Sequence, residues 1–207
     1  MKKFGLMLAA ALLLPFMVQA EDYKEGVHYM QVAPGPASNK GTIEVLEMFG
    51  YSCPHCNSFE PLIKRWDSNK AEDVSFARVP AAWSPSWEQM ARAYYASEVL
   101  NTLDKTHEAT FQALHVERRR IRNAEEFADF YQNLGVEPEK FKNAFKSFAV
   151  ETKLRQGKQK MQKYQITGVP AMVVNGKYQV TAAMAGGHQQ MLKVVDYLVE
   201  KERSGGQ

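Results

Sequence analysis

Apolar positions along the chain form short continuous runs in some stretches and follow helical spacing in others. Residues 43–49 are a run of mostly apolar and branched residues, which predicts a buried strand. Apolar residues then recur at i, i+3, i+4 and i+7 from Phe59 to Trp66, which predicts an amphipathic helix that begins near Cys53. Residues 74–80 predict a second strand. The chain therefore opens with a βαβ unit.

The middle of the chain has helical periodicity throughout. Residues 85–150 predict four helices, and Ser86 with Gln89 has the pattern of a capping box at the start of the first. In the last of these helices, apolar residues from Phe141 to Phe148 are expected to share one face. This segment is expected to be wholly helical.

The last part of the chain returns to strands. A long basic helix is expected through residues 151–164, followed by strands at residues 171–174 and 178–180. The Asn175-Gly176 pair between these strands is a strong signal for a β-hairpin. An amphipathic helix at residues 189–201 is expected to close the fold.

The first twenty residues have the pattern of a secretory signal with a cut after Ala20, and read MKKFGLMLAAALLLPFMVQA. Their apolar run is too short for a permanent membrane span, so we expect an exported, soluble mature protein. With 45% apolar and 24% charged residues, the composition is that of a globular protein. Removal of Lys2 and Lys3 leaves 24 basic against 23 acidic residues, a balance that does not suggest a nucleic-acid or anionic-membrane partner.

Cys53 and Cys56 are the only two cysteines among the 207 residues. A disulfide between them would close so small a ring that it would stabilise the fold little, because the benefit grows with loop length. A structural zinc site requires about four ligands. Covalent haem attachment requires histidine directly after the second cysteine, where Asn57 stands. Stabilisation of the fold, structural zinc and haem attachment are therefore poor explanations of the pair.

The predicted helix places the two thiols in different surroundings. Cys53 falls at the helix N-terminus, where unpaired N–H groups and the helix dipole stabilise a thiolate. Pro54 removes no hydrogen bond in the first turn, and His55 can add a donor or positive charge to the same sulfur. Cys56 is expected to be the shielded, resolving thiol. If the reduced thiolate is stabilised more than the disulfide, the disulfide is an oxidant.

Two motifs together carry a family resemblance. Cys53-Pro54-His55-Cys56 on a strand-to-helix turn, an all-helical insertion, and Gly168-Val169-Pro170-Ala171 before a hairpin resemble the DsbA family of periplasmic thiol:disulfide oxidoreductases in the thioredoxin superfamily. That family is itself the standard example of an oxidising dithiol with a stabilised thiolate. The resemblance implies an α/β, thioredoxin-like fold with an inserted all-helical domain. Residues 1–20 would be the signal peptide, residues 21–84 and 151–207 the two parts of the thioredoxin-like domain, and residues 85–150 the insertion.

The resemblance also implies an activity and its partners. The protein would be a disulfide oxidase that donates the Cys53–Cys56 disulfide to cysteine pairs of reduced exported polypeptides in the periplasm. It would need no cofactor beyond that disulfide and no metal, and would act as a monomer. A DsbB-like, quinone-linked oxidase of the inner membrane would reoxidise it. A cis peptide bond before Pro170 would present the Val169 backbone to an extended substrate.

Glu47 is a carboxylate within an otherwise apolar strand. One interpretation is that it points to solvent. The resemblance favours burial beneath the active site, with Arg78 on the neighbouring strand as its partner in accepting or relaying the proton of Cys56. The remaining histidines, His28, His107, His115 and His188, are expected to be surface residues without partners.

Two alternative functions follow from the same residues. A disulfide isomerase or reductase could use the same dithiol, although isomerases of this type carry an upstream dimerisation domain and only about twenty mature residues precede the first strand. A metal carrier could use Cys53, Cys56 and nearby Met48. Stoichiometric copper or zinc binding by the reduced protein would separate a carrier from an oxidase. The short segment 181–187 leaves the shape of the peptide groove open.

Overall fold

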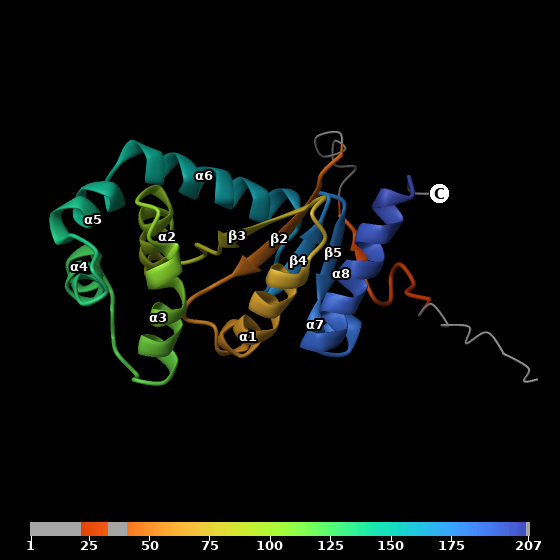
Figure 1. The fold of residues 1–207 in the computed structure, drawn as a ribbon, viewed down its shortest axis with the longest axis horizontal. Coiled ribbons are helices and arrows are strands. Elements are labelled where there is room, and N and C mark those ends of the chain that lie inside the picture. The colour runs from red at the N-terminus through yellow and green to blue at the C-terminus, as the bar shows by residue number, and fades with distance from the viewer. Residues whose placement is uncertain (1–21, 33–40, 206–207) are drawn as a thin grey trace, which may run out of the picture.

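A central five-stranded sheet organises the computed structural model, which describes residues 22–32 and 41–205; the predicted signal peptide, residues 1–20, lies outside the described residues. The strand order is β1-β5-β4-β2-β3 (Figure 1). Neighbouring strands β2 and β3 run parallel, and the other pairs are antiparallel. The strands are β1 (Met30–Gln31), β2 (Ile43–Phe49), β3 (Val74–Pro80), β4 (Ala171–Val174) and β5 (Tyr178–Thr181).

Helices connect and cover these strands. The expected βαβ unit is confirmed as β2, α1 and β3. The helices are α1 (Pro54–Asn69), α2 (Pro85–Val99), α3 (Leu103–His115), α4 (Ala124–Gln132), α5 (Pro138–Phe145), α6 (Phe148–Lys163), α7 (Ala182–Ala185) and α8 (His188–Arg203). Within the described part of the chain, none of these helices is long and apolar enough to cross a membrane.

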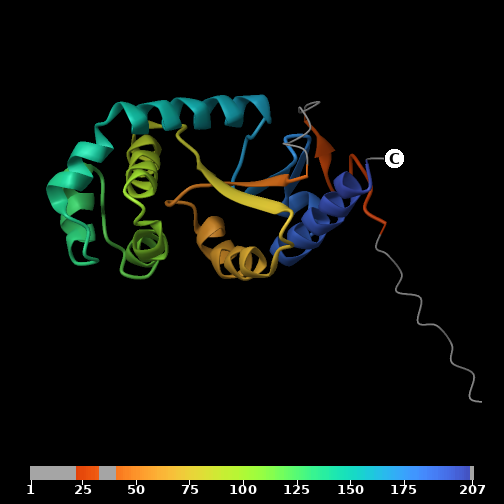
Figure 2. The same ribbon diagram turned by 45° about the horizontal axis from the view of Figure 1, so that its top comes forward.

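Helices cover both faces of the sheet. On one face α1 and α8 pack against side chains that include Val45 and Val180, and on the other α6 packs against Leu46 and Met48 (Figures 1 and 2). Successive side chains of a strand point to opposite faces. Glu47 therefore shares the face of Val45 and lies under α1, the helix that carries the cysteines.

The helical region lies at one end of the sheet and has its own core. Helices α2, α3, α4 and α5 pack around aromatic side chains, and α6 runs from this region onto the sheet (Figure 1). The core includes the buried side chains of Phe111, Phe127, Tyr131 and Phe141.

Two expectations about helix boundaries are wrong. The cap of α2 is Ser84, whose Oγ accepts from the Trp87 backbone N–H at 3.4 Å, so Ser86 with Gln89 does not form the cap. Pro85 suits the first position of a helix, so α2 begins before Ser86, at Pro85. Phe148 does not share the face of Phe141, because α5 ends at Phe145 and a new helix begins after Ser147.

The β4–β5 connection confirms the predicted hairpin. Asn175 and Gly176 have positive φ angles of 51° and 62°, as a two-residue hairpin turn with this sequence requires. The Lys177 backbone N–H closes this turn by donating to the Val174 carbonyl at 3.0 Å, and the strands pair from Val174 and Tyr178 onward. The hairpin holds β4 next to β2, the strand that leads into the cysteine turn.

Phe141 and Phe148 provide a matched test of the helical core. Phe141 is fully buried with its ring centroid 5.0 Å from that of Tyr131, whereas Phe148 is 80% exposed. We expect Phe141→Ala to lower the free energy of unfolding by about 3–5 kcal/mol, because it leaves a cavity. Phe148→Ala is expected to change it by less than about 0.5 kcal/mol. Urea unfolding curves measure both, and similar losses would contradict this packing.

Candidate active site

Cys53 is the N-cap of α1, with Pro54 at the first helical position. Its backbone is extended, with φ −85° and ψ 118°, and no side chain caps this helix end. The unpaired N–H groups of the first turn are therefore left to stabilise negative charge at the start of the helix. Cys53 is only 8% exposed as a residue, and both cysteines are free thiols.

The Val169-Pro170 loop lies directly against Cys53. The Cys53 Sγ donates to the Val169 carbonyl at 3.4 Å, although 116 residues separate the two in the chain. The Val169–Pro170 peptide bond is cis, as expected. Strand β4 begins at the next residue, Ala171, so the sheet itself holds this loop beside the thiol.

The turn that leads into Cys53 is closely packed. The Cys53 backbone N–H donates to the Gly50 carbonyl at 3.0 Å. A Cβ atom on Gly50 would collide with the ring of Trp87, which comes from α2. Glycine at position 50 thus allows α2 to pack against the turn.

Cys56 has the opposite surroundings to Cys53. It is fully buried one turn into α1. Burial raises the pKa of the Cys56 thiol well above its ordinary value, and the neighbouring Cys53 and the charge of Glu47 raise it further. Cys56 is therefore held as a protonated thiol.

Glu47 and Arg78 form a buried ion pair in the sheet below. The parallel register sets them side by side, and the Arg78 Nε donates to the Glu47 Oε2 at 2.9 Å. Glu47 is fully buried, so the solvent-facing interpretation is wrong. Burial raises the pKa of Glu47 to about 7, against the opposing effect of the Arg78 charge.

Two further titratable side chains, Glu60 and His107, were not predicted from the sequence and extend this pair. The Arg78 Nη2 donates to the Glu60 Oε1 at 3.0 Å, and the His107 Nε2 lies 3.3 Å from the Glu60 Oε2. Burial lowers the pKa of His107, although Glu60 opposes this effect. Glu60 lies four residues after Cys56, on the buried stripe of α1, and this spacing was the available signal.

Histidines of α3 hold the cysteine turn through Tyr51. The His107 Nδ1 shares a hydrogen bond of 2.9 Å with the Tyr51 hydroxyl, and the His115 Nε2 donates to the Tyr51 carbonyl at 2.7 Å. The expectation that these two histidines lack partners is wrong. His28 also has a partner, since its Nδ1 accepts from the Lys24 backbone N–H at 2.9 Å.

His55 is exposed in the first turn of α1, and its ring faces His188. The two ring centroids are 6.4 Å apart, and His188 also packs against Phe59 at 5.3 Å. Partial burial and the nearby His55 lower the pKa of His188. His188 is therefore not the isolated surface residue that the sequence predicted.

These features define a thioredoxin-like thiol:disulfide exchange protein, with two thiols at a helix N-terminus facing a proline loop. Among the described residues no group of three or more His, Cys, Asp or Glu side chains could hold a metal ion. The chain belongs to the family described as the DSBA-like thioredoxin domain, whose model matches residues 63–199.

Known relatives agree with this assignment. The thiol:disulfide interchange protein DsbA of Pseudomonas aeruginosa is 42% identical over 199 residues, which cover 96% of this chain and 94% of that protein. DsbA of Azotobacter vinelandii is 39% identical over 206 residues, covering 97% and 96%. The crystal structure of Pseudomonas aeruginosa DsbA superposes with a TM-score of 0.85 at 41% identity, covering 89% of this chain and 97% of that one. The chain is a thiol:disulfide oxidoreductase with a thioredoxin-like fold and a helical insertion.

The raised pKa of Glu47 predicts how stability depends on pH. The unfolded chain releases this proton near the ordinary glutamate pKa of 4.5, while the folded protein keeps it up to about pH 7. The folded state therefore loses stability as pH rises between these values, by about 3 kcal/mol in all. Glu47→Gln should remove this loss. Between these two pH values, the free energy of unfolding of the variant should therefore rise relative to that of the unmodified protein, as measured by urea unfolding of the reduced form.

Glu44→Gln is the matched control, because Glu44 is a half-buried residue of the same strand. Its stability should follow that of the unmodified protein at every pH. A constant difference between the Glu47→Gln variant and the unmodified protein from pH 4.5 to 8 would contradict the raised pKa.

Proposed function

We propose that the Cys53–Cys56 pair oxidises cysteine pairs of reduced exported polypeptides by transferring its disulfide to them. The observation that carries this proposal is the contrast between the two thiols. Cys53 caps the N-terminus of α1 beside the Val169 carbonyl, and Cys56 is fully buried behind it. A client can reach only the first sulfur, and charge is stabilised only there.

The first step is attack by a client thiolate on the Cys53 sulfur of the disulfide. A mixed disulfide forms, the Cys53–Cys56 bond breaks, and Cys56 leaves with the electron pair. Because burial raises the pKa of Cys56, its sulfur takes up a proton. Glu47, with a pKa of about 7, is the buried acid positioned to supply it, and Arg78 then stabilises the carboxylate.

The second step is attack by the other client thiolate on the client sulfur of the mixed disulfide. The client disulfide forms, and Cys53 leaves as a thiolate that the start of α1 stabilises. His55 in the first turn adds to this effect when it is protonated. The two electrons taken from the client remain in the Cys53–Cys56 dithiol.

The proposed location, cofactor and partners of the protein follow from its family. The protein acts in the periplasm after cleavage of its signal peptide, as a monomer, with no cofactor beyond its own disulfide. A DsbB-like, quinone-linked oxidase of the inner membrane takes the two electrons and restores the disulfide. Main-chain contacts at Val169 and Pro170 hold the client with little regard for its sequence.

An oxidase of this kind is expected to be more stable reduced than oxidised. The Cys53 thiolate is stabilised only in the folded, reduced protein, so reduction should raise the free energy of unfolding. Urea unfolding of the oxidised and the reduced protein at pH 7 gives the sign of the difference between their free energies of unfolding. Each form is compared with its own unfolded chain, in which the disulfide is intact or reduced. A more stable oxidised form would favour a reductase.

His55 is expected to tune the dithiol without supporting the fold. His55→Ala should leave urea unfolding of the oxidised form unchanged, because the side chain is exposed. It should make the disulfide about three- to tenfold less oxidising in equilibrium with glutathione, since the donor or positive charge that His55 can add beside Cys53 is lost. His28→Ala, at a half-buried histidine outside the site, should leave the equilibrium with glutathione unchanged. If the equilibrium with glutathione is unchanged in His55→Ala, the helix N-terminus alone accounts for the oxidising strength of the Cys53–Cys56 disulfide.

A further inference from the structure

The segment between α3 and α4 carries four arginines in five residues, and its sequence is RRRIR. This segment, residues 118–122, is termed the arginine strip. We propose that it binds an acidic, extended stretch of the reduced client while the client's cysteine reacts at Cys53. The inference rests on the proposed oxidation of polypeptides and names the class of client that the site prefers.

The strip begins beside the cysteine turn. His115, the last residue of α3, donates to the carbonyl of Tyr51, which lies two residues before Cys53. Arg118 follows His115 by three residues, a distance of at most about 11 Å along an extended chain. A client held at Cys53 therefore reaches the strip within a few residues of its reacting cysteine.

The strip then turns back along the end of α3. The Arg119 backbone N–H donates to the Ala113 carbonyl at 2.8 Å. From there the strip runs toward α4 on the side of the helical region opposite α6 (Figure 1).

Three of the four arginines of the strip have no carboxylate partner among the described residues, whereas Arg119 pairs with Glu117 at 3.4 Å. Arg118, Arg120 and Arg122 are exposed, and none of them forms an ion pair within residues 22–32 and 41–205. Exposed cations elsewhere, such as Lys64 with Glu108, do pair. The nearby Glu126 accepts from the Arg122 backbone N–H at 2.8 Å, so its carboxylate caps α4. Three free guanidinium groups are the chemistry that recognises carboxylates.

Part of the strip's backbone also lacks hydrogen-bond partners among the described residues. Arg120 and Ile121 lie outside helix and strand, and their backbone groups form no hydrogen bond with any other residue that the structure describes. Free N–H and C=O groups in such a segment can pair with an extended chain. The strip thus offers main-chain partners as well as charge.

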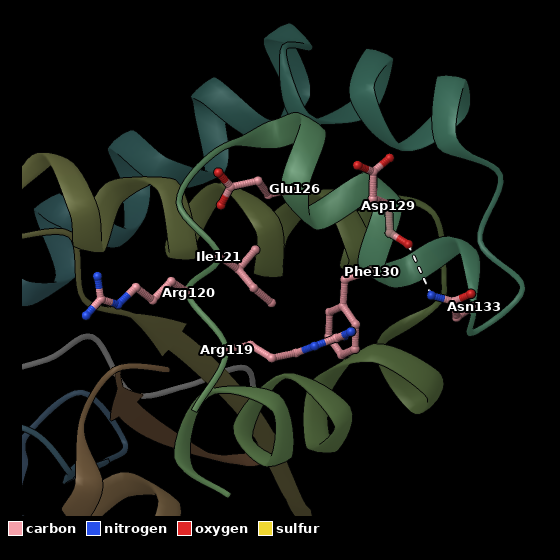
Figure 3. Close-up of a pocket in the computed structure, with 7 residues that line it drawn as sticks. All are labelled: Arg119, Arg120, Ile121, Glu126, Asp129, Phe130 and Asn133. Carbon is pink, nitrogen blue, oxygen red and sulfur yellow. Dashed lines mark hydrogen bonds between the residues drawn. The ribbon is translucent and has the colours of Figure 1, made fainter. Parts of the chain in front are cut away.

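The two sides of the strip differ in chemistry. Figure 3 shows Arg119 and Ile121 pointing toward α4, with Arg120 on the other side of the chain. On the α4 side a cavity of about 440 Å³ contains Phe130, whose ring lies 5.1 Å from the Arg119 guanidinium carbon. Glu126 and Asp129 also line this cavity, so it does not suit an acidic client side chain. Acidic client side chains belong on the outer side, with Arg120 and Arg122.

Three peptides of equal length test this assignment. Each contains one cysteine pair, flanked by four glutamates, four glutamines or four lysines, and its oxidation by the oxidised protein is followed by stopped flow. At low salt the glutamate peptide should have a KM about tenfold below that of the glutamine peptide, and the lysine peptide a higher one. The preference should shrink at about 0.5 M salt, because exposed charges are screened.

A triple variant and a matched control locate the effect. Arg118→Gln, Arg120→Gln and Arg122→Gln together should abolish the preference for the glutamate peptide and leave oxidation of the glutamine peptide as before. Lys24→Gln, Arg155→Gln and Lys163→Gln remove the same charge from exposed positions outside the strip and should keep the preference.

The outcomes separate the strip from the activity. Equal KM values for the three peptides with the unmodified protein, or an unchanged preference in the strip variant, would overturn the assignment while oxidation itself stands. Strip-dependent binding to phosphatidylglycerol vesicles without any peptide preference would assign the strip to a membrane surface and overturn it as well. Failure of the unmodified protein to oxidise even the glutamine peptide would contradict the proposed function and the strip together.

Discussion

The unpaired backbone N–H groups at the start of α1 are the constraint on which the site depends. Only an atom at the N-cap lies at the positive end of the helix, and the chain places the Cys53 sulfur there. Cys56 lies one turn further on, where burial opposes any charge on sulfur. One turn of helix therefore separates a sulfur at the positive end of the helix from one whose pKa is raised by burial. This difference gives the disulfide its direction of transfer.

The helical insertion contributes to this constraint through α3. Tyr51 is held at its hydroxyl by His107 and at its carbonyl by His115, so the turn before Cys53 is fixed from the side away from the sheet. The same region buries the carboxylates of Glu47 and Glu60, which would be costly if they were not paired. Arg78 offsets part of that cost because it donates a hydrogen bond to each of them. Sheet, α1 and insertion thus meet in one polar network beneath the thiols.

Local patterns in the sequence predict the elements of the fold better than they predict contacts between them. The strand at residues 43–49 and the hairpin at Asn175 follow from short-range signals, and the structure confirms both. The proximity of Cys53 and Val169 came from the family resemblance, because spacing in the sequence says nothing about residues 116 positions apart.

Some side chains could not be placed from local pattern alone. His107 looks like a lone polar residue on a helix, and only tertiary packing shows that it meets Glu60 and Tyr51. Phe148 continued the apolar spacing of α5, but the serine before it caps a new helix and turns the ring to solvent. Helical periodicity cannot register a break that a single capping side chain introduces.

The buried charges also explain why proton transfer to Cys56 is favourable in the proposed mechanism. A thiolate on Cys56 would be fully buried, whereas a carboxylate on Glu47 has the Arg78 Nε at 2.9 Å. Moving a proton from Glu47 to Cys56 keeps the number of buried charges constant and shifts the negative charge next to a cation. The Glu47 Oε1 has no hydrogen-bond partner among the described residues, so one oxygen can carry the proton while the other accepts from Arg78. In the proposed mechanism, a neutral glutamine at position 47 could neither supply that proton nor carry the resulting charge.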